Sequence, residues 1–568
     1  MAKIRGSVRR SQLVTTYGVG SVVPVGDEAF MVAALERWVV AEPDVHEPRL
    51  ERELRIRGFV QPPSSDDLPD VPVVRFPTYQ SCPVCRRLAR HRDFTHSDLS
   101  DCPECSAALV PSRFVVACEN GHIDDFPYER WVHRGSASAA DRHELSLHST
   151  GMTASLKGIV VRCTCGAERT MEEAFDRNAL RDVTSCQGRR PWKTFDRESC
   201  DAKPRALQRG ASSVWFAHTR SALSIPPWSR SASRALDSHW ATLRHLPAAA
   251  VGPVISSMRL DEKTGFSLDE LIAIFDQRKL HEAGEPTGER NLRAEEYDAL
   301  VRGRPETPDD IDFATLSEEV PESLKSWFAQ VQLVTRLREV RALSGFARIL
   351  PPRGPDGEGA NVVSLMTDEV DWLPAIEVKG EGIFLRLDAD RVAEWAGRPG
   401  VVARAESLDA ANRRRHEQWG TEPDRTITAE FLLLHALAHA LIGQLALDAG
   451  YPAGSLRERL YHEDGALGVL LYTATTDSAG SLGGLIAQGR ADRLENFVRE
   501  GVARMAWCSS DPVCIESEAT GADSLNLAAC HSCALLPETS CEEMNGFLDR
   551  ATLVGTRDDS QVGFFEGI

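Results

Sequence analysis

The pattern of apolar and polar positions predicts helices at several places in the chain. Residues 267–280 carry apolar side chains at helical spacing, and an apolar run over 429–447 predicts a second helix. Thr428 is placed to cap that second helix, which we expect to stop at Gly450. Helical spacing also occurs over 323–343, where it predicts a third helix.

Other stretches favour strands. Residues 372–387 and 205–228 are rich in the β-branched and aromatic residues that strands prefer, and the second stretch ends at Pro226-Pro227. Short strands and turns are expected over residues 1–75, with a tight turn at the sequence Tyr-Gly-Val-Gly that ends at Gly20. The overall prediction is a multidomain α+β chain.

Changes in composition divide the chain into four predicted regions. A linker rich in Pro and Asp over 61–72 separates the first two. The regions are a β-rich N-terminal segment (1–75), a cysteine-rich zinc-binding region (76–230), a mainly helical middle region (231–345) and a C-terminal domain with a second cysteine cluster (346–568). We expect zinc-ribbon modules in the N-terminal third and a mixed α/β fold in the C-terminal domain.

The charge balance restricts the possible partners. The chain has 65 Lys and Arg against 84 Asp and Glu, a net charge of −19, so any contact with nucleic acid must come from a local basic patch or a partner subunit. No apolar run reaches the roughly 18 residues that span a bilayer, and the basic N-terminus lacks a signal peptide's apolar stretch. We therefore expect a soluble, cytoplasmic protein that does not bind membranes.

The strongest motif is a pair of CxxC sequences separated by 16 residues. Cys82 and Cys85 form the first pair, and Cys102 and Cys105 the second. Each CxxC turn directs two thiolates at one point, and four thiolates complete the tetrahedral shell of Zn²⁺. A shell closed by four protein ligands has no position for water, so this site is predicted to be structural.

A second group of cysteines follows in the same region. Cys163, Cys165, Cys186 and Cys200 are predicted to form a second zinc site, although their spacing is not diagnostic. Cys118 and His122 have the spacing of a half-site. With the first ribbon complete, the sequence slightly favours a packed thiol and a histidine that hydrogen-bonds a turn.

The C-terminal cysteines offer more donors than one zinc site needs. The preferred set is Cys508, Cys514, Cys530 and Cys533, with Cys541 as a possible substitute and His531 as a further donor. A thioredoxin-like redox role lacks the βαβ context that this motif requires. Zinc is therefore the predicted cofactor at both ends of the chain.

Two histidines one helical turn apart raise an alternative function. His435 and His439 lie on one face of the helix predicted over 429–447, so the alternative hypothesis is a metal-dependent hydrolase or nuclease that also uses Asp477. A zinc protease would need a glutamate directly after the first histidine, and Ala436 stands there. A hydrogen-bonded structural pair is the preferred interpretation.

Arginines cluster around the N-terminal cysteines of this otherwise acidic chain. Arg86, Arg87, Arg189, Arg190, Arg205 and Arg209 are the candidates for contacts with nucleic acid. Arginine pairs with phosphates, and nearby tryptophans can stack on single-stranded bases. The sequence GxxxxGK[ST] of an ATP-binding loop does not occur in the chain, so the chain is not expected to be an ATPase.

Several long motifs resemble those of the DrmB family, subunits of the bacterial DISARM anti-phage system. They are RRSQLVTTYGVGSVV, CENGHIDDFPYERWVH, QRGASSVWF, SIPPW, GEGIF and AACHSCALLPETSCEEMNGFLDR, which together run from about residue 9 to 550. The C-terminal third is also similar to the cysteine-bearing domain of Mrf-type repair helicases, here with a wider gap between Cys514 and Cys530.

The resemblance implies a partner role. DrmB proteins pair with DrmA, a superfamily 2 helicase, and the pair engages DNA with a single-stranded 5′ overhang. We therefore expect a non-catalytic, zinc-binding subunit that docks on a DrmA-type helicase and helps to hold DNA, with catalysis left to the helicase.

Overall fold

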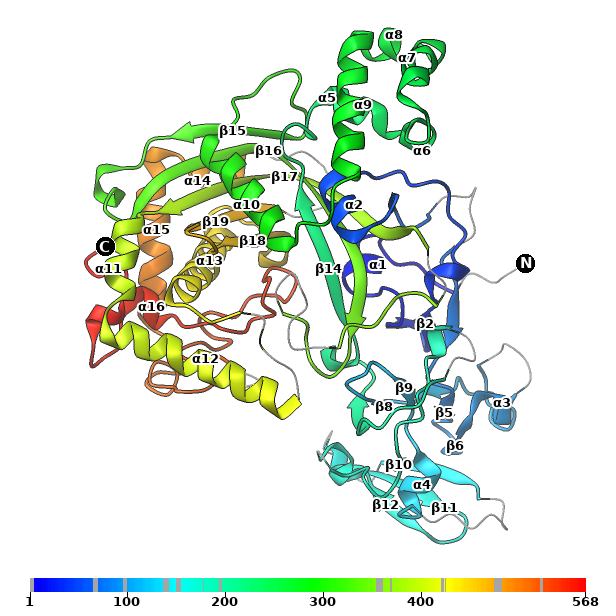
Figure 1. The fold of residues 1–568 in the computed structure, drawn as a ribbon. Helices are drawn as coiled ribbons and strands as arrows, with labels where there is room; N and C mark the ends of the chain where they lie inside the picture. Colours follow the sequence, from blue (N-terminus) through cyan, green and yellow to red (C-terminus); the bar gives the residue numbers. More distant parts are fainter. Residues whose placement is uncertain are drawn as a thin grey trace.

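The computed structural model describes residues 5–568 with internal gaps at 65–69, 96–99, 136–142, 150–154, 177, 194–196, 354–360, 368–369, 420–422, 424, 474–482 and 521–524. Four sheets and several groups of helices make up this part of the chain, so the predicted multidomain α+β class is confirmed. In Figure 1 a large curved sheet occupies the centre, a group of helices lies above it, and the cysteine-rich modules lie below it on one side.

The central sheet has seven strands and joins distant parts of the chain. Its main path is β14 (Phe216–Leu223), β16 (Phe328–Ala347), β17 (Trp372–Leu387), β19 (Gly468–Thr473) and β18 (Leu456–Tyr461), all antiparallel neighbours. β15 (Phe313–Glu318) pairs with β16, and β3 (Gly58–Val60) pairs in parallel with β17. These strands come from all four predicted regions, so the sheet binds those regions into one framework.

The strand predicted over 372–387 is confirmed as β17, but the helix predicted over 323–343 is wrong. Residues Phe328–Ala347 form β16, the longest strand, and both faces of that strand are buried. A strand buried on both faces carries a nearly continuous apolar run, which periodicity cannot distinguish from a buried helix. Residues 328–347 form a strand because their backbone pairs with β14, β15 and β17.

The helix predicted over 429–447 is confirmed as α13 (Ala429–Asp448), and the Thr428 side chain caps it by accepting from the Phe431 amide. This helix is apolar all round because it is the core of the C-terminal domain. It is long and apolar enough to cross a membrane, yet 78% of its most apolar window is buried inside the protein. α15 (Ala491–Met505) and β18 pack against it.

The remaining C-terminal helices pack against α13 or α15 (Figure 1). They are α11 (Ala389–Ala396), α12 (Pro399–Trp419), α14 (Gly484–Gln488) and α16 (Ala551–Val554). The middle region contributes a separate helical group with its own apolar core around Trp240 and Phe275. Its members are α5 (Ser231–Asp237), α6 (Trp240–Leu243), α7 (Ala248–Ser257), α8 (Leu260–Thr264) and α9 (Leu268–Glu282), and α9 confirms the helix predicted over 267–280. α10 (Glu289–Arg302) packs instead against β16 and β18 of the central sheet (Figure 1).

Three small sheets form the N-terminal part of the molecule. The first contains β1 (Val22–Val25), β2 (Glu28–Val32) and β4 (Val73–Arg75), preceded by α1 (Gln12–Thr15), and α2 (Pro48–Leu54) leads into β3. The second contains β12 (Glu168–Thr170), β11 (Ile159–Cys163), β10 (Leu145–Ser149), β6 (Arg87–Arg90), β5 (Tyr79–Ser81) and β7 (Val110–Pro111). The third contains β13 (Arg205–Gln208), β8 (Phe114–Ala117) and β9 (Ile123–Asp125). Their connecting segments, which also include α3 (His91–Phe94) and α4 (Tyr128–Val132), carry eight cysteines, and a ninth, Cys163, ends β11.

Candidate metal centres

Five groups of potential metal ligands lie in the described part of the chain. In each group, the donor atoms of four side chains lie within 4.8 Å of one another. Four groups consist of cysteines, or of cysteines and histidines, on loops and at the ends of strands. The fifth group includes two histidines of the core helix α13.

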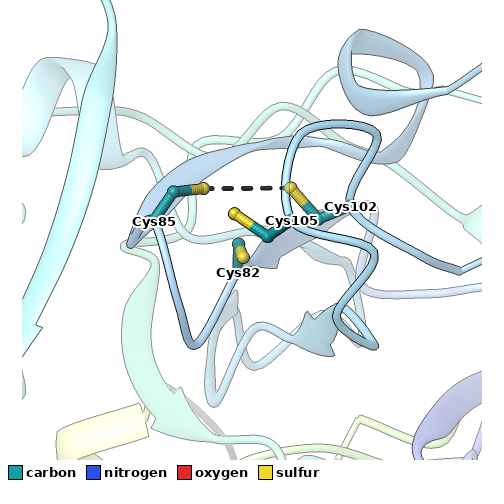
Figure 2. A group of neighbouring side chains, drawn as sticks. All are labelled: Cys82, Cys85, Cys102 and Cys105. Atoms are coloured by element: carbon teal, nitrogen blue, oxygen red, sulfur yellow. Dashed lines mark hydrogen bonds between the residues drawn. The ribbon is translucent and has the colours of Figure 1, made fainter.

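The first group joins the two CxxC turns, as their spacing predicts. Figure 2 shows the side chains of Cys82, Cys85, Cys102 and Cys105 directed toward one another, with the sulfurs of Cys85 and Cys102 3.8 Å apart. Cys82 and Cys102 are buried, whereas Cys85 is exposed. Buried Phe94 and Leu109 pack against this group and form its small apolar core.

The two CxxC turns of this first group have the same backbone geometry. The amide of Arg86 donates to the carbonyl of Cys82 at 2.9 Å, and the amide of Ser106 donates to the carbonyl of Cys102 at 2.8 Å. Arg86 and Ser106, each directly after the second cysteine, adopt left-handed φ values of 66° and 55°. That conformation is uncommon for residues other than glycine, and here it turns both thiols of each pair toward the same point.

The second group is Cys118, His122, Cys186 and Cys200. Cys118 and His122 close the hairpin between β8 and β9, where Gly121 has a φ of +78°. The sulfur of Cys118 lies 3.4 Å from Nδ1 of His122, 3.6 Å from the sulfur of Cys186 and 3.9 Å from that of Cys200. The sequence favoured a packed thiol and a histidine that hydrogen-bonds a turn. The structure instead places Cys118 and His122 in a group of four potential metal ligands.

Negative charge and hydrogen bonds in this second group favour the binding of a cation. The hydrogen bond between Cys118 and Cys186 lowers the pKa of Cys186 to about 4, which favours a thiolate at neutral pH. Nε2 of His122 lies 2.6 Å from the Glu198 carboxylate, which also pairs with Arg190 at 2.7 Å. A carboxylate on the far ring nitrogen fixes the tautomer that leaves Nδ1 to a metal.

The third group is His133, His143, Cys163 and Cys165. Cys163 ends β11, and the Cys163–Gly166 turn leads into β12. Nε2 of His133 lies 3.3 Å from the Cys165 sulfur, and Nδ1 of His143 lies 3.2 Å from the Cys163 sulfur. The other ring nitrogen of His133 lies 2.7 Å from the Glu129 carbonyl, which orients the ring.

The second site predicted from sequence is therefore divided between two groups. Cys163 and Cys165 lie with two histidines, and Cys186 and Cys200 lie with Cys118 and His122. The sequence reasoning missed His133 and His143. The sequence did contain a signal for them. Cys163 and Cys165 supply only two of the four ligands that a zinc site needs, and the two histidines lie 20 to 32 residues before these cysteines, near the same sheet.

The fourth group is Cys508, Cys514, Cys530 and Cys533, the preferred C-terminal set. Its sulfurs approach one another at 3.4 Å between Cys508 and Cys530 and at 3.7 Å between Cys514 and Cys533. Asp511 holds the first turn by accepting from the Cys508 amide at 2.8 Å. Cys541, the possible substitute, lies instead with His435 and His439.

The donor sets of these four groups fit zinc. Thiolate sulfur and imidazole nitrogen are the preferred ligands of Zn²⁺, and two groups offer four thiols, one offers three thiols with one imidazole, and one offers two of each. Without a cation, thiolates this close would repel one another. Four ligands complete a tetrahedral shell, so the four groups suit structural zinc ions.

The six candidate arginines have different surroundings. Three pair with carboxylates: Arg87 with Glu104, Arg189 with Asp124, and Arg190 with Glu198. Arg86 is exposed, and its guanidinium lies 3.1 Å from a ring nitrogen of His148. Arg205 begins β13 and is half-buried.

Arg209 faces a different environment from the other five. It lines a cavity of about 720 Å³ between the N-terminal segment, β14 and the C-terminal loop, and burial lowers its pKa. The carboxylates of Glu289 and Glu542 line the same cavity. The predicted arginines thus do not form one continuous surface.

The fold and these groups define a multidomain α+β protein with zinc-binding modules at both ends. Residues 437–534 match the MrfA Zn-binding domain, and residues 9–216 match a domain of unknown function, DUF8724. The chain is 34% identical to the DISARM protein DrmB of Bacillus paralicheniformis over 519 residues, which cover 88% of this chain and 91% of that relative. The chain therefore belongs to the DrmB family of DISARM proteins, as its sequence motifs indicated.

Proposed function

We propose that this chain is a non-catalytic subunit of a DISARM complex that docks on a DrmA-type helicase and helps to hold DNA with a single-stranded 5′ overhang. The observation that carries the proposal is the 34% identity with a DISARM DrmB protein along nearly the whole chain. The closed ligand sets support a scaffold role for the metal ions, and the absent ATP-binding loop leaves the motor function to a partner.

A groove beside the second metal group is the best candidate for a phosphate contact. This cavity of about 480 Å³ lies between the first ribbon and the Cys118 group. Five arginines line it, namely Arg90, Arg92, Arg130, Arg189 and Arg197, against three carboxylates, Asp124, Asp125 and Glu129. Arg92, Arg130 and Arg197 are exposed, so their guanidinium groups are accessible to phosphate.

The test is DNA binding by the complete helicase complex. The triple variant Arg92→Gln, Arg130→Gln, Arg197→Gln should weaken binding to 5′-overhang DNA and make it less sensitive to salt. Removal of one phosphate interaction with a single strand reduces the slope of log K against log salt by about 0.7, so removal of three reduces it by about 2. Co-purification with the helicase should not change.

A matched control separates a local interaction from net charge. Arg55, Arg259 and Arg413 are also exposed, with side-chain exposures of 74%, 69% and 60%, and none lines the groove. Their triple Gln variant removes the same charge and should bind DNA as the wild type does. Equally weakened binding in both triple variants, or unchanged binding in the groove variant, would disprove the proposed phosphate site.

A further inference from the structure

The fifth ligand group lies in the core of the C-terminal domain. His435 and His439 project from one side of α13, Glu458 comes from β18, and Cys541 comes from the loop that follows the fourth metal group. His435, His439 and Glu458 are 0%, 1% and 1% exposed, and Cys541 is 5% exposed. Three separate segments thus place potential metal ligands next to one another in the protein interior.

The donor atoms face one another. Nε2 of His435 lies 3.3 Å from Oε1 of Glu458 and 3.2 Å from the Cys541 sulfur, and Nε2 of His439 lies 3.6 Å from Oε2 of Glu458. Nδ1 of His439 lies 2.6 Å from the Ala534 carbonyl, to which it must donate. In the neutral ring, Nε2 of His439 therefore carries a lone pair directed at the carboxylate.

Two of these atoms have no hydrogen-bond partner within the described residues. They are Nε2 of His439 and Oε2 of Glu458, both fully buried. A buried acceptor without a partner destabilises the folded state, and a charged one does so more strongly. A cation between these two facing acceptors satisfies both, and a metal ion, unlike a proton on the His439 ring, is also within reach of His435 and Cys541.

We propose that His435, His439, Glu458 and Cys541 bind a fifth metal ion, a tetrahedral Zn²⁺. Two imidazole nitrogens, one carboxylate oxygen and one thiolate sulfur are all accepted zinc ligands. The charges also balance, because Zn²⁺ with one carboxylate, one thiolate and two neutral imidazoles has no net charge. A buried site without net charge avoids most of the cost of placing an ion in the protein interior.

The surrounding backbone supports the ligands. The amides of Glu543 and Asn545 both donate to the Cys541 sulfur at 3.3 Å, and the amide of Glu542 donates to Glu458 at 3.1 Å. Ala534, whose carbonyl orients His439, directly follows Cys533 of the fourth group. The fifth ion therefore fastens α13 and β18 to the same loop that carries the fourth group.

This site is structural in the described fold. Its four ligands fill the tetrahedral shell and leave no position for a water nucleophile. The buried histidines do not face an open surface, and Asp477, the third residue of the alternative hydrolase, lies outside the described residues. Metal binding at this buried site requires neither DNA nor the helicase.

The test counts zinc in the full-length chain purified without added metal. Five zinc ions per chain are expected, one for each ligand group. Cys541→Ser and His439→Gln should each retain four, and the double variant should also retain four because both residues serve one site. Cys533 is a ligand of the fourth group, so Cys533→Ser should likewise lose one zinc ion. The double variant Cys533→Ser, Cys541→Ser should lose two zinc ions.

His462→Gln is the matched control. This histidine lies beside the same helix, with its ring 4.8 Å from that of Phe431, but does not belong to the group, so the variant should retain five zinc ions. If a variant fails to fold, ¹¹³Cd NMR of the cadmium-loaded wild type decides the question. Five resonances, one of them from a site with mixed N, O and S ligands, support the fifth site. Four zinc ions or four resonances in the wild type would overturn it.

Discussion

The sulfur atoms of Cys118 and Cys186 lie 3.6 Å apart, although 68 residues separate the two cysteines in the chain. This contact assigns Cys186 to the hairpin group at His122 and separates it from Cys163 and Cys165. The division of the N-terminal ligands into three groups, where the sequence predicted two sites, has direct consequences for metal binding.

The first prediction concerns pairs of cysteine substitutions. Cys118→Ser and Cys186→Ser should each lose one zinc ion, and their double variant should also lose only one. Cys165→Ser combined with Cys186→Ser should lose two, because these residues serve different groups. Zinc analysis of the purified variants measures this directly. Loss of a single zinc ion from the Cys165/Cys186 double variant would show that both cysteines serve one site, as the sequence predicted.

The second prediction concerns the two histidines that the sequence reasoning missed. His133→Gln and His143→Gln should each lose one zinc ion and lower the melting temperature, because a structural zinc ion contributes folding energy. His148→Gln, on the neighbouring β10, lies outside the group and should retain the full zinc content. Equal zinc contents in all three variants would show that the third group does not bind metal.

The third prediction concerns Arg338, a buried arginine of β16 that joins the N-terminal segment to the central sheet. Its guanidinium pairs with Glu377 at 2.7 Å and with Glu47 at 3.6 Å, and it donates to the His46 carbonyl at 3.0 Å. Arg338→Met removes a buried cation and leaves Glu47 with Arg49 as its remaining ion-pair partner, so it should lower the free energy of unfolding by about 3 kcal/mol.

The control for Arg338 lies two residues away on the same strand. Arg336 pairs with Glu306 near the surface, and both side chains are partly exposed, at 39% and 57%. Arg336→Met should therefore cost about 1 kcal/mol or less. Urea titration of the zinc-loaded variants compares the two. Similar decreases in stability would mean that the buried network is not what holds the N-terminal segment.

The fourth prediction is a pH dependence from His281, in the last turn of α9. Burial and the charges of Arg52 and Arg49 lower its pKa from 6.5 to about 4. Between these pH values the unfolded chain binds the proton and the folded chain does not, so stability is full above pH 6.5 and falls as the pH decreases toward 4.

His281→Gln removes this contribution. The melting temperatures of wild type and variant are measured at several pH values from 7.5 to 4.5. As the pH falls, the melting temperature of the wild type should decrease more than that of the variant. Protonation of metal ligands affects both proteins and cancels in the difference between their melting temperatures. A difference that is independent of pH would show that His281 titrates normally.

The sequence by itself determined the features that depend on neighbouring residues. Each CxxC turn places two thiols side by side whatever the rest of the chain does, so the group at Cys82 could be named from spacing, as could the Cys530–Cys533 half of the C-terminal group. The 372–387 strand and the helix capped by Thr428 were likewise encoded locally, and the long motifs identified the DrmB family.

Only the tertiary structure decided which distant residues meet. The pairing of β8 with β9 and β13, and of β10 with β11, selected the partners of Cys186 and Cys163 across long stretches of chain. The same kind of pairing made a strand of residues 328–347, and α13 packing on β18 placed Glu458 and Cys541 against His435 and His439. These choices arise from hydrogen bonds and burial between segments far apart in the chain, which local periodicity and spacing do not record.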